Sequence, residues 1–136
     1  HRKAPTCLFI NGNSGLNLRN GSGIVDAKGK QLMNAIIGKG SKDKGVLGKI
    51  AYQNHGIGSE GFDVVSNMFS THYFFENIEM LNEYLKNVSE NCKINGYFIG
   101  TCYDGKKVFD MFSKQSSDTV EMKDSMGSLI YQIKKL

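Results

Sequence analysis

The sequence predicts an α/β protein with a largely parallel sheet. Three short apolar runs have the length and composition of strands, and they alternate with segments whose apolar residues recur at helical spacing. Strands separated by helices are typical of parallel pairing, because the chain needs a crossover between parallel neighbours. Two alternating stretches near the carboxyl terminus predict an additional antiparallel ribbon. The length of 136 residues suits one domain.

The amino-terminal part predicts one strand and two helices. Residues 6–10 read TCLFI and stop at NGNSG, which indicates a strand followed by a tight loop. We expect Asp26 to cap a helix with apolar residues at helical spacing, and Gly38 to end it. Residues 45–54 predict a second helix, and the sequence GIGSEG at residues 56–61 predicts a loop.

The central part predicts a strand, a helix and a second strand. The segment from Phe62 to Asn67 has the pattern of a buried strand. Asn77 is expected to begin a long amphipathic helix, NIEMLNEYLKNVSENCK, which Asn95 and Gly96 end. The next buried strand is predicted over GYFIGTC.

The carboxyl-terminal part predicts a short helix and a hairpin. Residues 106–112 form an amphipathic pattern in which three large apolar side chains are expected to point inward. These three side chains are Val108, Phe109 and Phe112. The alternating stretches DTVEMK and SLIYQIKK, joined by residues 124–127, predict a β-hairpin.

Composition and charge limit the partners only loosely. The net charge is +4 and lysines gather in two stretches, which fits either a polyanionic partner such as RNA or the solvated faces of helices. No stretch approaches the roughly 20 apolar residues of a membrane helix, so we expect no membrane partner. The three cysteines, at wide spacings, fit no metal motif and predict reduced thiols.

The carboxyl ends of the predicted strands gather the residues of a candidate site. Ligands of parallel α/β sheets bind beyond these ends, which here are followed by residues 11–15, 67–75 and 101–106. If the strands are parallel, the three loops converge on one rim. They offer amide and hydroxyl groups, several aromatic rings and one carboxylate, a mixture that suits an aromatic heterocycle with hydrogen-bonding edges.

The phrases FDVVSNMFSTHYFFEN and NGYFIGTCYDGKKVF, separated by a helix, resemble the mRNA cap guanine-N7 methyltransferases, most closely those in capping enzymes of large DNA viruses. LFINGNSGLNLRNG is similar to the third-strand segment of that family. The resemblance implies a partial Rossmann-like, class I S-adenosylmethionine-dependent methyltransferase fold, with strands three to five, a β-hairpin insertion and no first two strands. Residues 1–136 would then be a fragment of a single methyltransferase domain, inactive by itself.

The function that this resemblance implies is methyl transfer from S-adenosylmethionine to N7 of the 5′-terminal guanine of capped RNA. The partners would be the capped RNA 5′ end and the remainder of the capping enzyme or a partner subunit. The location would be a cytoplasmic viral factory or the virion for a viral protein, and the nucleus for a cellular one. The alternative is a non-catalytic RNA-binding or scaffolding module of a capping complex.

Carried over by position, the resemblance assigns two sets of site residues and no catalytic side chain beyond positioning, because N7 has a free lone pair and the sulfonium is already activated. The residues expected at the cofactor are Asn13, Ser14, Met68 and Phe69. The residues expected at the cap are His72, Tyr73, Tyr103 and Asp104. Asn13 stands where the family usually has an acid that reads the adenine amino group, and its amide oxygen can still accept. Met68 stands where many members carry Gln, and Tyr103-Asp104 replaces a Pro-Asn pair of cellular members.

Structural roles compete with these assignments. Phe69 could be core packing, like Phe74 and Phe75, which we expect to be core, and His72 could be a structural histidine. NGNSG could be a turn without a binding role. The family's Gly-rich turn and the acid ending its second strand do not occur here, and GIGSEG precedes a strand instead of following one. Without those strands, residues 6–10 are expected to re-pair or to be completed by another chain.

Overall fold

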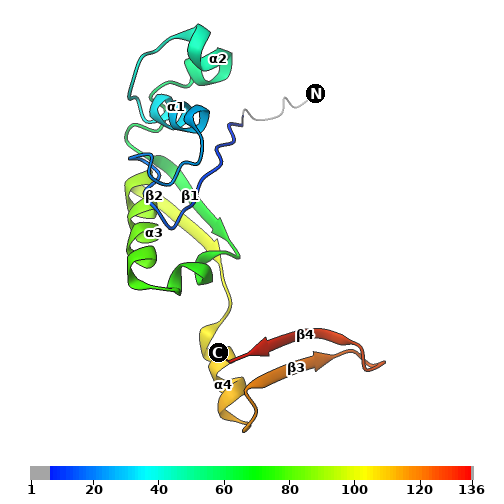
Figure 1. Ribbon diagram of the computed structural model, residues 1–136. Helices are drawn as coiled ribbons and strands as arrows, with labels where there is room; N and C mark the ends of the chain where they lie inside the picture. Colours follow the sequence, from blue (N-terminus) through cyan, green and yellow to red (C-terminus); the bar gives the residue numbers. More distant parts are fainter. Residues whose placement is uncertain (1–6, 136) are drawn as a thin grey trace. The chain divides into compact units, whose positions relative to one another are not determined.

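The computed structural model describes residues 7–135, which form two compact units, one up to Thr101 and one from Cys102 onward. The first unit contains helices α1, α2 and α3, a short 3-10 helix and the parallel strands β1 and β2 (Figure 1). The second contains helix α4 and the antiparallel strands β3 and β4. None of the helices in the described part of the chain is long and apolar enough to cross a membrane.

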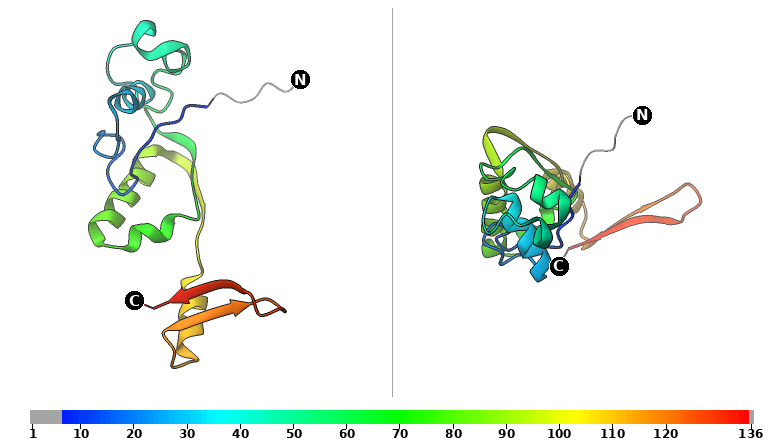
Figure 2. Two further views of the ribbon diagram at one scale, coloured as in Figure 1. Left: turned by 45° about the vertical axis from the view of Figure 1, so that its right-hand side comes forward. Right: turned by 90° about the horizontal axis from the view of Figure 1, so that it is seen from above.

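Helices α1 (Ala27–Ile36) and α2 (Lys44–Gln53) build a small apolar core in the first unit, and both confirm the prediction from helical spacing. Two further views of the ribbon show the helices next to each other (Figure 2). The buried residues that they bring together are Ala35, Leu47 and Ala51.

Local chemistry sets the ends and the bend of these two helices. Asp26 caps α1 as expected, since its carboxylate accepts a hydrogen bond from the Gly29 N–H at 2.7 Å. Gly38 takes a φ of 79° just beyond α1, the left-handed conformation that commonly ends a helix. Asp43 caps α2, and Gly48 interrupts its helical geometry with a φ of 76°. The sequence had not indicated these two features of α2.

A parallel β–α–β unit follows, as predicted. Its elements in chain order are β1 (Phe62–Met68), η1 (Thr71–Phe75), α3 (Ile78–Asn91) and β2 (Cys92–Thr101). Strands β1 and β2 pair in parallel, with Met68 opposite Thr101 at their carboxyl ends. Asn77 caps α3 through a hydrogen bond from the Met80 N–H to its side-chain oxygen at 2.8 Å. Figure 1 shows α3 alongside the two strands.

The boundary between α3 and β2 differs from the prediction. Helix α3 ends at Asn91 instead of at Asn95 and Gly96, and β2 begins directly at Cys92. Asn95 has a φ of 67° inside the strand, and the pairing register with β1 shifts in the same region. The Asn-Gly pair therefore marks an irregularity in a strand and not the end of a helix.

Neither parallel strand is buried, which contradicts the prediction for both. Val64, Tyr97 and Ile99 are exposed on one face of the pair, and Phe98 is exposed on the other. The sequence has the pattern of strands that are covered on both faces. Two strands and one adjacent helix are too few elements to provide that cover.

The predicted amino-terminal strand is not formed over its described residues. Thr6 lies outside the described part of the chain, and residues 7–10 take part in no strand there. An isolated antiparallel bridge joins Gly12 to Ile24 further along the segment. Residues 7–10 therefore do not re-pair within the chain, and their completion by another chain stays a prediction.

The second unit is a helix followed by a hairpin, as predicted. Its elements are α4 (Gly105–Ser113), β3 (Thr119–Lys123) and β4 (Leu129–Lys134). The hairpin strands pair from Thr119 opposite Lys134 to Lys123 opposite Leu129. Val108 and Phe112 of α4 are half-buried, but Phe109 is largely exposed, so its predicted inward orientation is wrong.

Candidate functional site

The carboxyl ends of β1 and β2 hold a turn that presents an aromatic ring outward. Phe69 directly follows β1 and has a φ of 54°, a left-handed conformation that is uncommon for a large side chain. Its N–H donates to the carbonyl oxygen of Thr101 at 2.9 Å and to the Thr101 hydroxyl at 3.0 Å. The Phe69 side chain is 64% exposed, so it does not act as core packing here. Such strained conformations cluster at ligand sites.

The 3-10 helix η1 adds two further rings and fastens itself to α3. The rings of His72 and Tyr73 have centroids 4.3 Å apart, and Tyr73 is 67% exposed. Phe74 is buried, as expected, and stacks on Tyr84 of α3 at 4.1 Å, with an interplanar angle of 7°. The Thr71 and Tyr84 hydroxyls lie 3.2 Å apart. Helix α3 therefore holds η1 in the orientation that leaves Tyr73 facing outward.

Phe75, the last residue of η1, is exposed, although we expected it to lie in the core. A 3-10 helix has about three residues per turn, so Phe74 and Phe75 cannot both face α3. The stacking of Phe74 on Tyr84 takes the inward position.

The loop that carries Asn13 and Ser14 lies against α3. The Asn13 side-chain oxygen accepts from the Gly15 N–H at 2.8 Å, which makes a local turn. A Cβ added to Gly15 would lie 2.8 Å from Cγ of Met80, in the first turn of α3, so only glycine fits there. Asn87 in turn donates to the Ser14 carbonyl oxygen at 2.9 Å. The turn expected as an alternative for NGNSG is present, and it leaves the Asn13 side chain exposed.

Six of the predicted site residues belong to the first unit, where two segments in contact with α3 carry them. These residues are Asn13, Ser14, Met68, Phe69, His72 and Tyr73. Met68 ends β1, and its sulfur lies 3.7 Å from the Thr101 hydroxyl oxygen, so its side chain packs beside the Phe69 turn. The assignment of these residues to cofactor and cap stays a prediction.

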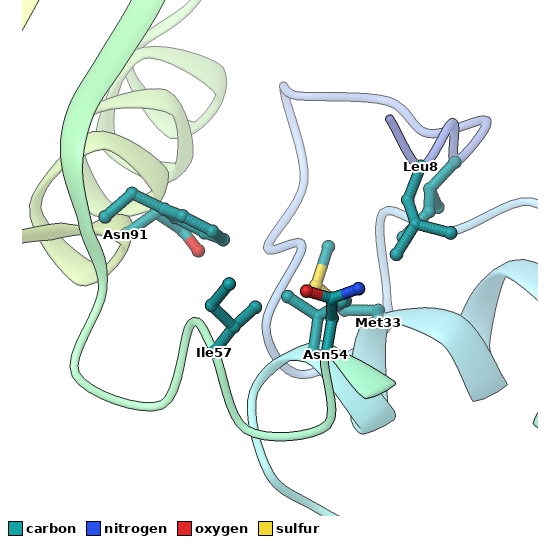
Figure 3. A pocket seen from close by; sticks show the side chains of 8 residues that line it. Leu8, Met33, Asn54, Ile57 and Asn91 are labelled. Atoms are coloured by element: carbon teal, nitrogen blue, oxygen red, sulfur yellow. The ribbon is translucent and has the colours of Figure 1, made fainter. Parts of the chain in front are cut away.

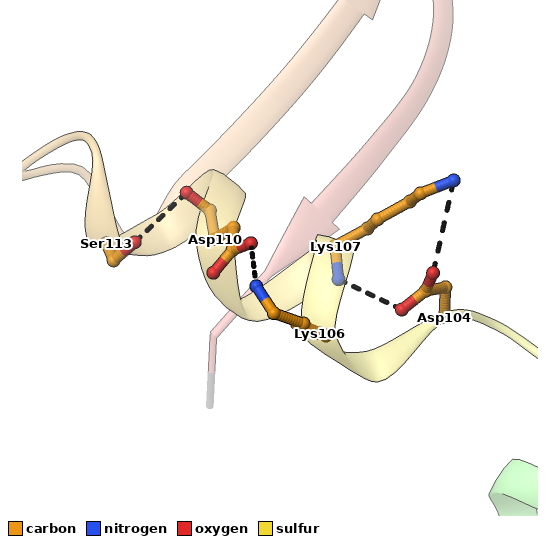
Figure 4. A network of polar contacts seen from close by, with 5 residues as sticks. All are labelled: Asp104, Lys106, Lys107, Asp110 and Ser113. Carbon is orange, nitrogen blue, oxygen red and sulfur yellow. Dashed lines mark hydrogen bonds and ion pairs between the residues drawn. The ribbon is translucent and has the colours of Figure 1, made fainter.

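Tyr103 and Asp104 belong to the second unit. Asp104 caps α4, because its carboxylate accepts from the Lys107 N–H at 3.1 Å and lies 3.9 Å from the Lys107 ammonium (Figure 4). Tyr103 is exposed just before this cap. The convergence of Tyr103 with Asn13 and Tyr73 on one rim stays a prediction.

The sequence reasoning missed a polar clasp between α3 and the amino-terminal loop. Asn87 is only 5% exposed, and its amide nitrogen donates to the carbonyl oxygens of Ser14 and Leu16 at 2.9 and 2.7 Å. Its side-chain oxygen accepts from the Leu18 N–H at 2.8 Å. Asn17, 3% exposed, donates from the loop to the carboxylate of Glu90 at 2.9 Å. Asparagines are common in turns and on polar helix faces, so the sequence carries no signal for this clasp.

Arg19 completes this attachment at the carboxyl-terminal end of α3. Its guanidinium donates to the carbonyl oxygens of Gly58, Ser59 and Glu90 at 3.2, 2.9 and 2.8 Å. It therefore joins the amino-terminal loop, the loop before β1 and the end of α3. The guanidinium of Arg19 therefore has a structural role, although a basic residue could also be interpreted as an RNA contact.

We call the exposed Phe69 and the neighbouring His72–Tyr73 pair the ring cluster. The first unit also contains two hollows that are separate from this cluster. One has a volume of about 320 Å³ and a mostly apolar lining that includes Leu8, Met33 and Ile57, with Asn54 and Asn91 at its edge (Figure 3). Another, of about 310 Å³, lies between β1 and α3. Neither is lined by Phe69, His72 or Tyr73, so the rings lie on the exposed strand end. Ser14, one of the residues predicted at the cofactor, lines the second hollow.

The first unit contains a parallel β–α–β unit that carries rings at its strand ends and a polar loop on its crossover helix. These features define an α/β domain suited to a flat ligand with hydrogen-bonding edges. Residues 41–135 match the family described as mRNA (guanine-N(7))-methyltransferase domain. The match extends over most of the chain and into both units, and the chain belongs to this family.

Named relatives agree with the family match. The chain is 38% identical over 77 residues to an mRNA cap guanine-N(7) methyltransferase of Aspergillus niger, which covers 57% of this chain and 12% of that protein. The protein of the same name from Candida glabrata is 40% identical over 72 residues, or 53% of this chain and 17% of its own length. The one from Saccharomyces cerevisiae is 38% identical over 71 residues, or 52% and 16%.

These comparisons cover only part of each relative, since the matched segment spans 12–17% of their lengths. The three relatives are fungal, so the closer likeness to viral capping enzymes stays a prediction. No solved structure gives a significant match. The family and the mixed α/β structure are consistent with a class I methyltransferase fold.

Proposed function

We propose that this chain is part of an mRNA cap guanine-N7 methyltransferase, which transfers a methyl group from S-adenosylmethionine to N7 of the 5′-terminal guanine of capped RNA. Membership of the family supports this proposal, as do the names of the relatives. The observation that carries it is the ring cluster of Phe69, His72 and Tyr73 at the carboxyl end of β1. In the complete enzyme these strands would belong to a Rossmann-like sheet.

The exposed rings suit the methyl acceptor. Guanine is flat, and methylation at N7 makes it cationic, so it gains attraction to aromatic faces as the reaction proceeds. Tyr73 is 67% exposed and lies beside the His72 ring, which gives a purine a surface on which to stack. Stacking fixes the plane of the purine and leaves its N7 edge open to the donor.

The residues at the loop and at the end of β1 fit the methyl donor. One lone pair of the Asn13 side-chain oxygen is engaged by Gly15, which leaves the second pair and the amide N–H groups for an adenine edge. Met68 and Phe69 offer a thioether and an exposed ring beside the sulfonium portion. S-adenosylmethionine itself supplies the activated methyl group, and these side chains bind and orient it.

The proposed chemistry asks for positioning and not for a proton acceptor. The lone pair of guanine N7 is available at neutral pH, so methyl transfer displaces the thioether directly. Holding two reactants in line can lower a barrier by about 7–11 kcal/mol. The backbone bonds from Phe69 to Thr101 and the stacking of Phe74 on Tyr84 make the strand end rigid enough for this role.

The proposal is tested with the full-length protein, radiolabelled S-adenosylmethionine, and capped and uncapped RNA. We expect label only in capped RNA, released by nuclease digestion as a cap dinucleotide that contains 7-methylguanosine. Tyr73→Ala should lower kcat/KM for capped RNA at least about fivefold, because stacking of a base on a ring contributes about 1–3 kcal/mol. The matched control is Tyr73→Phe, which keeps the ring face and should leave kcat/KM within about twofold of wild type.

Two results would contradict this proposal. Binding of a cap analogue without transfer would favour the non-catalytic RNA-binding module instead. Equal losses from Tyr73→Ala and Tyr73→Phe would show that the Tyr73 ring does not act by stacking on the acceptor.

A further inference from the structure

Helix α3 links the two sides of the proposed site. Its amino-terminal half fixes the acceptor side, since Tyr84 contacts both Thr71 and Phe74 of η1. Asn87, less than one turn further along, holds the loop of the donor side. The separation of donor and acceptor segments is therefore set along one rigid element.

Asn87 uses its hydrogen-bonding capacity on the backbone of a single loop. Both amide N–H groups are engaged, one by the Ser14 carbonyl oxygen at 2.9 Å and one by the Leu16 carbonyl oxygen at 2.7 Å. The side-chain oxygen accepts from the Leu18 N–H at 2.8 Å. Only 5% of the Asn87 surface is exposed, so water cannot take over its hydrogen bonds unless the loop moves.

The rest of the loop has little freedom to compensate for a loss of these bonds. A Cβ on Gly23 would lie 2.6 Å from the Asn13 carbonyl oxygen, and a Cβ on Gly15 would meet Met80 at 2.8 Å. Asn17 is held by Glu90, three residues beyond Asn87 on the same side of α3. The loop therefore fits α3 in one arrangement.

We propose that Asn87 is a positioning residue for the methyl donor. It holds residues 13–18 on α3, so that Asn13 and Ser14 are placed to bind the adenosyl part of S-adenosylmethionine. This inference rests on the proposed function, because the family resemblance assigns Asn13 and Ser14 to the cofactor. The three hydrogen bonds of the Asn87 side chain all go to the backbone of residues 14–18, so its loss acts on the donor and not on the capped RNA.

Two substitutions of Asn87 in the full-length protein test the inference. Asn87→Leu removes all three hydrogen bonds. Asn87→Asp keeps the shape and the acceptor for Leu18 but places a carboxylate against two carbonyl oxygens, so it carries the test if the leucine variant does not fold. The matched control is the same pair of changes at Asn82, an exposed asparagine of the same helix. Leu47→Ala, in the α1–α2 core, controls for lower stability alone.

The measurements are the calorimetric Kd for S-adenosylmethionine, the KM values for S-adenosylmethionine and for capped RNA, kcat and the melting temperature. We expect both Asn87 variants to raise the Kd and KM for S-adenosylmethionine at least about tenfold, with the KM for capped RNA within about twofold of wild type. The Asn82 variants and Leu47→Ala should leave the Kd within about twofold, measured well below their melting temperatures.

Three results would overturn the inference while leaving the proposed function intact. One is an unchanged Kd for S-adenosylmethionine in the Asn87 variants. Another is a rise in this Kd no larger than that in Leu47→Ala. The third is an equal rise in the KM for capped RNA. A wild-type protein that binds S-adenosylmethionine but does not transfer to capped RNA contradicts the proposed function instead, and the Kd comparison then still tests Asn87.

Discussion

The two units of the chain differ in the interactions that stabilise each of them. The first has buried apolar side chains between α1 and α2 and buried asparagines that bridge segments about 70 residues apart in sequence. In the second, none of the described residues is buried, and the hydrogen bonds belong to one helix and one hairpin. A helix with one hairpin is at best marginally stable without a core. Tertiary contacts therefore stabilise the first unit, whereas caps and strand pairing define the second.

The largest effect that we expect comes from the core of the first unit. Leu47→Ala removes a buried side chain between two helices and should lower the free energy of unfolding by about 2–4 kcal/mol. Val46→Ala, at the exposed neighbouring position, should change it by less than about 0.5 kcal/mol. Denaturant unfolding measures both. Equal losses at the two positions would show that this core does not stabilise the unit.

A somewhat smaller loss is expected from the polar clasp. Asn17→Ala removes the hydrogen bond to Glu90 and leaves the Asn20 N–H without its acceptor, at a cost of about 1–3 kcal/mol. Amide exchange of residues 14–19 should become faster, while exchange in α4 stays the same. The matched control is Asn11→Ala, at an exposed position of the same segment. Unchanged exchange at residues 14–19 would contradict the role of the clasp.

In the second unit the main local determinant is a helix cap. Asp104→Ala should destabilise α4 by about 1 kcal/mol, which NMR chemical shifts of the α4 amides would report. Asp110→Ala, which removes the exposed pair with Lys106, should cost only about 0.3–0.5 kcal/mol. Asp104→Asn should still cap helix α4, so this variant separates the structural role of Asp104 from its proposed contact with the 5′ cap of RNA. Equal effects of the two alanine changes would contradict the capping role.

The smallest effects concern two exposed ion pairs, one in each unit. The hydrogen bond and the charge of Lys93 lower the pKa of Asp63 below its ordinary range, and Lys123 and Gln132 lower the pKa of Glu121. A carboxylate with a lowered pKa in the folded state adds stability above its ordinary pKa of about 4, and this stability disappears as the pH falls through the lowered value.

An NMR titration of the side-chain carboxyl groups measures this effect. In Lys93→Met, the pKa of Asp63 should return toward its ordinary value, while that of Glu121 stays low. A pKa for Asp63 that does not change in this variant would contradict the assignment of the shift to Lys93.

The sequence predicted the elements well where the signals were local. Asp26 and Asn77 begin helices with regular apolar spacing, and the hairpin lies between two alternating stretches. The predicted β–α–β order and parallel pairing were confirmed because a helix between two strands leaves few other connections.

The failures arose where distant contacts decide the structure. The apolar runs at Val64 and Phe98 predicted buried strands, but burial depends on neighbours that the local pattern cannot supply. The Asn-Gly pair favours turns and so predicts a helix end at Asn95, but β2 accommodates Asn95 as an irregularity instead. The bonds of Asn87 join segments about 70 residues apart, so no local pattern reveals them.

The central claim is that the first unit carries the donor site and the aromatic part of the acceptor site, arranged along α3. Hydrogen exchange of the full-length protein, with S-adenosylhomocysteine or a cap analogue, tests it most directly. We predict that S-adenosylhomocysteine slows exchange at residues 11–18 and 68–70, and that the cap analogue slows it at residues 71–75. If neither ligand changes exchange at any of these three segments, the claim is contradicted.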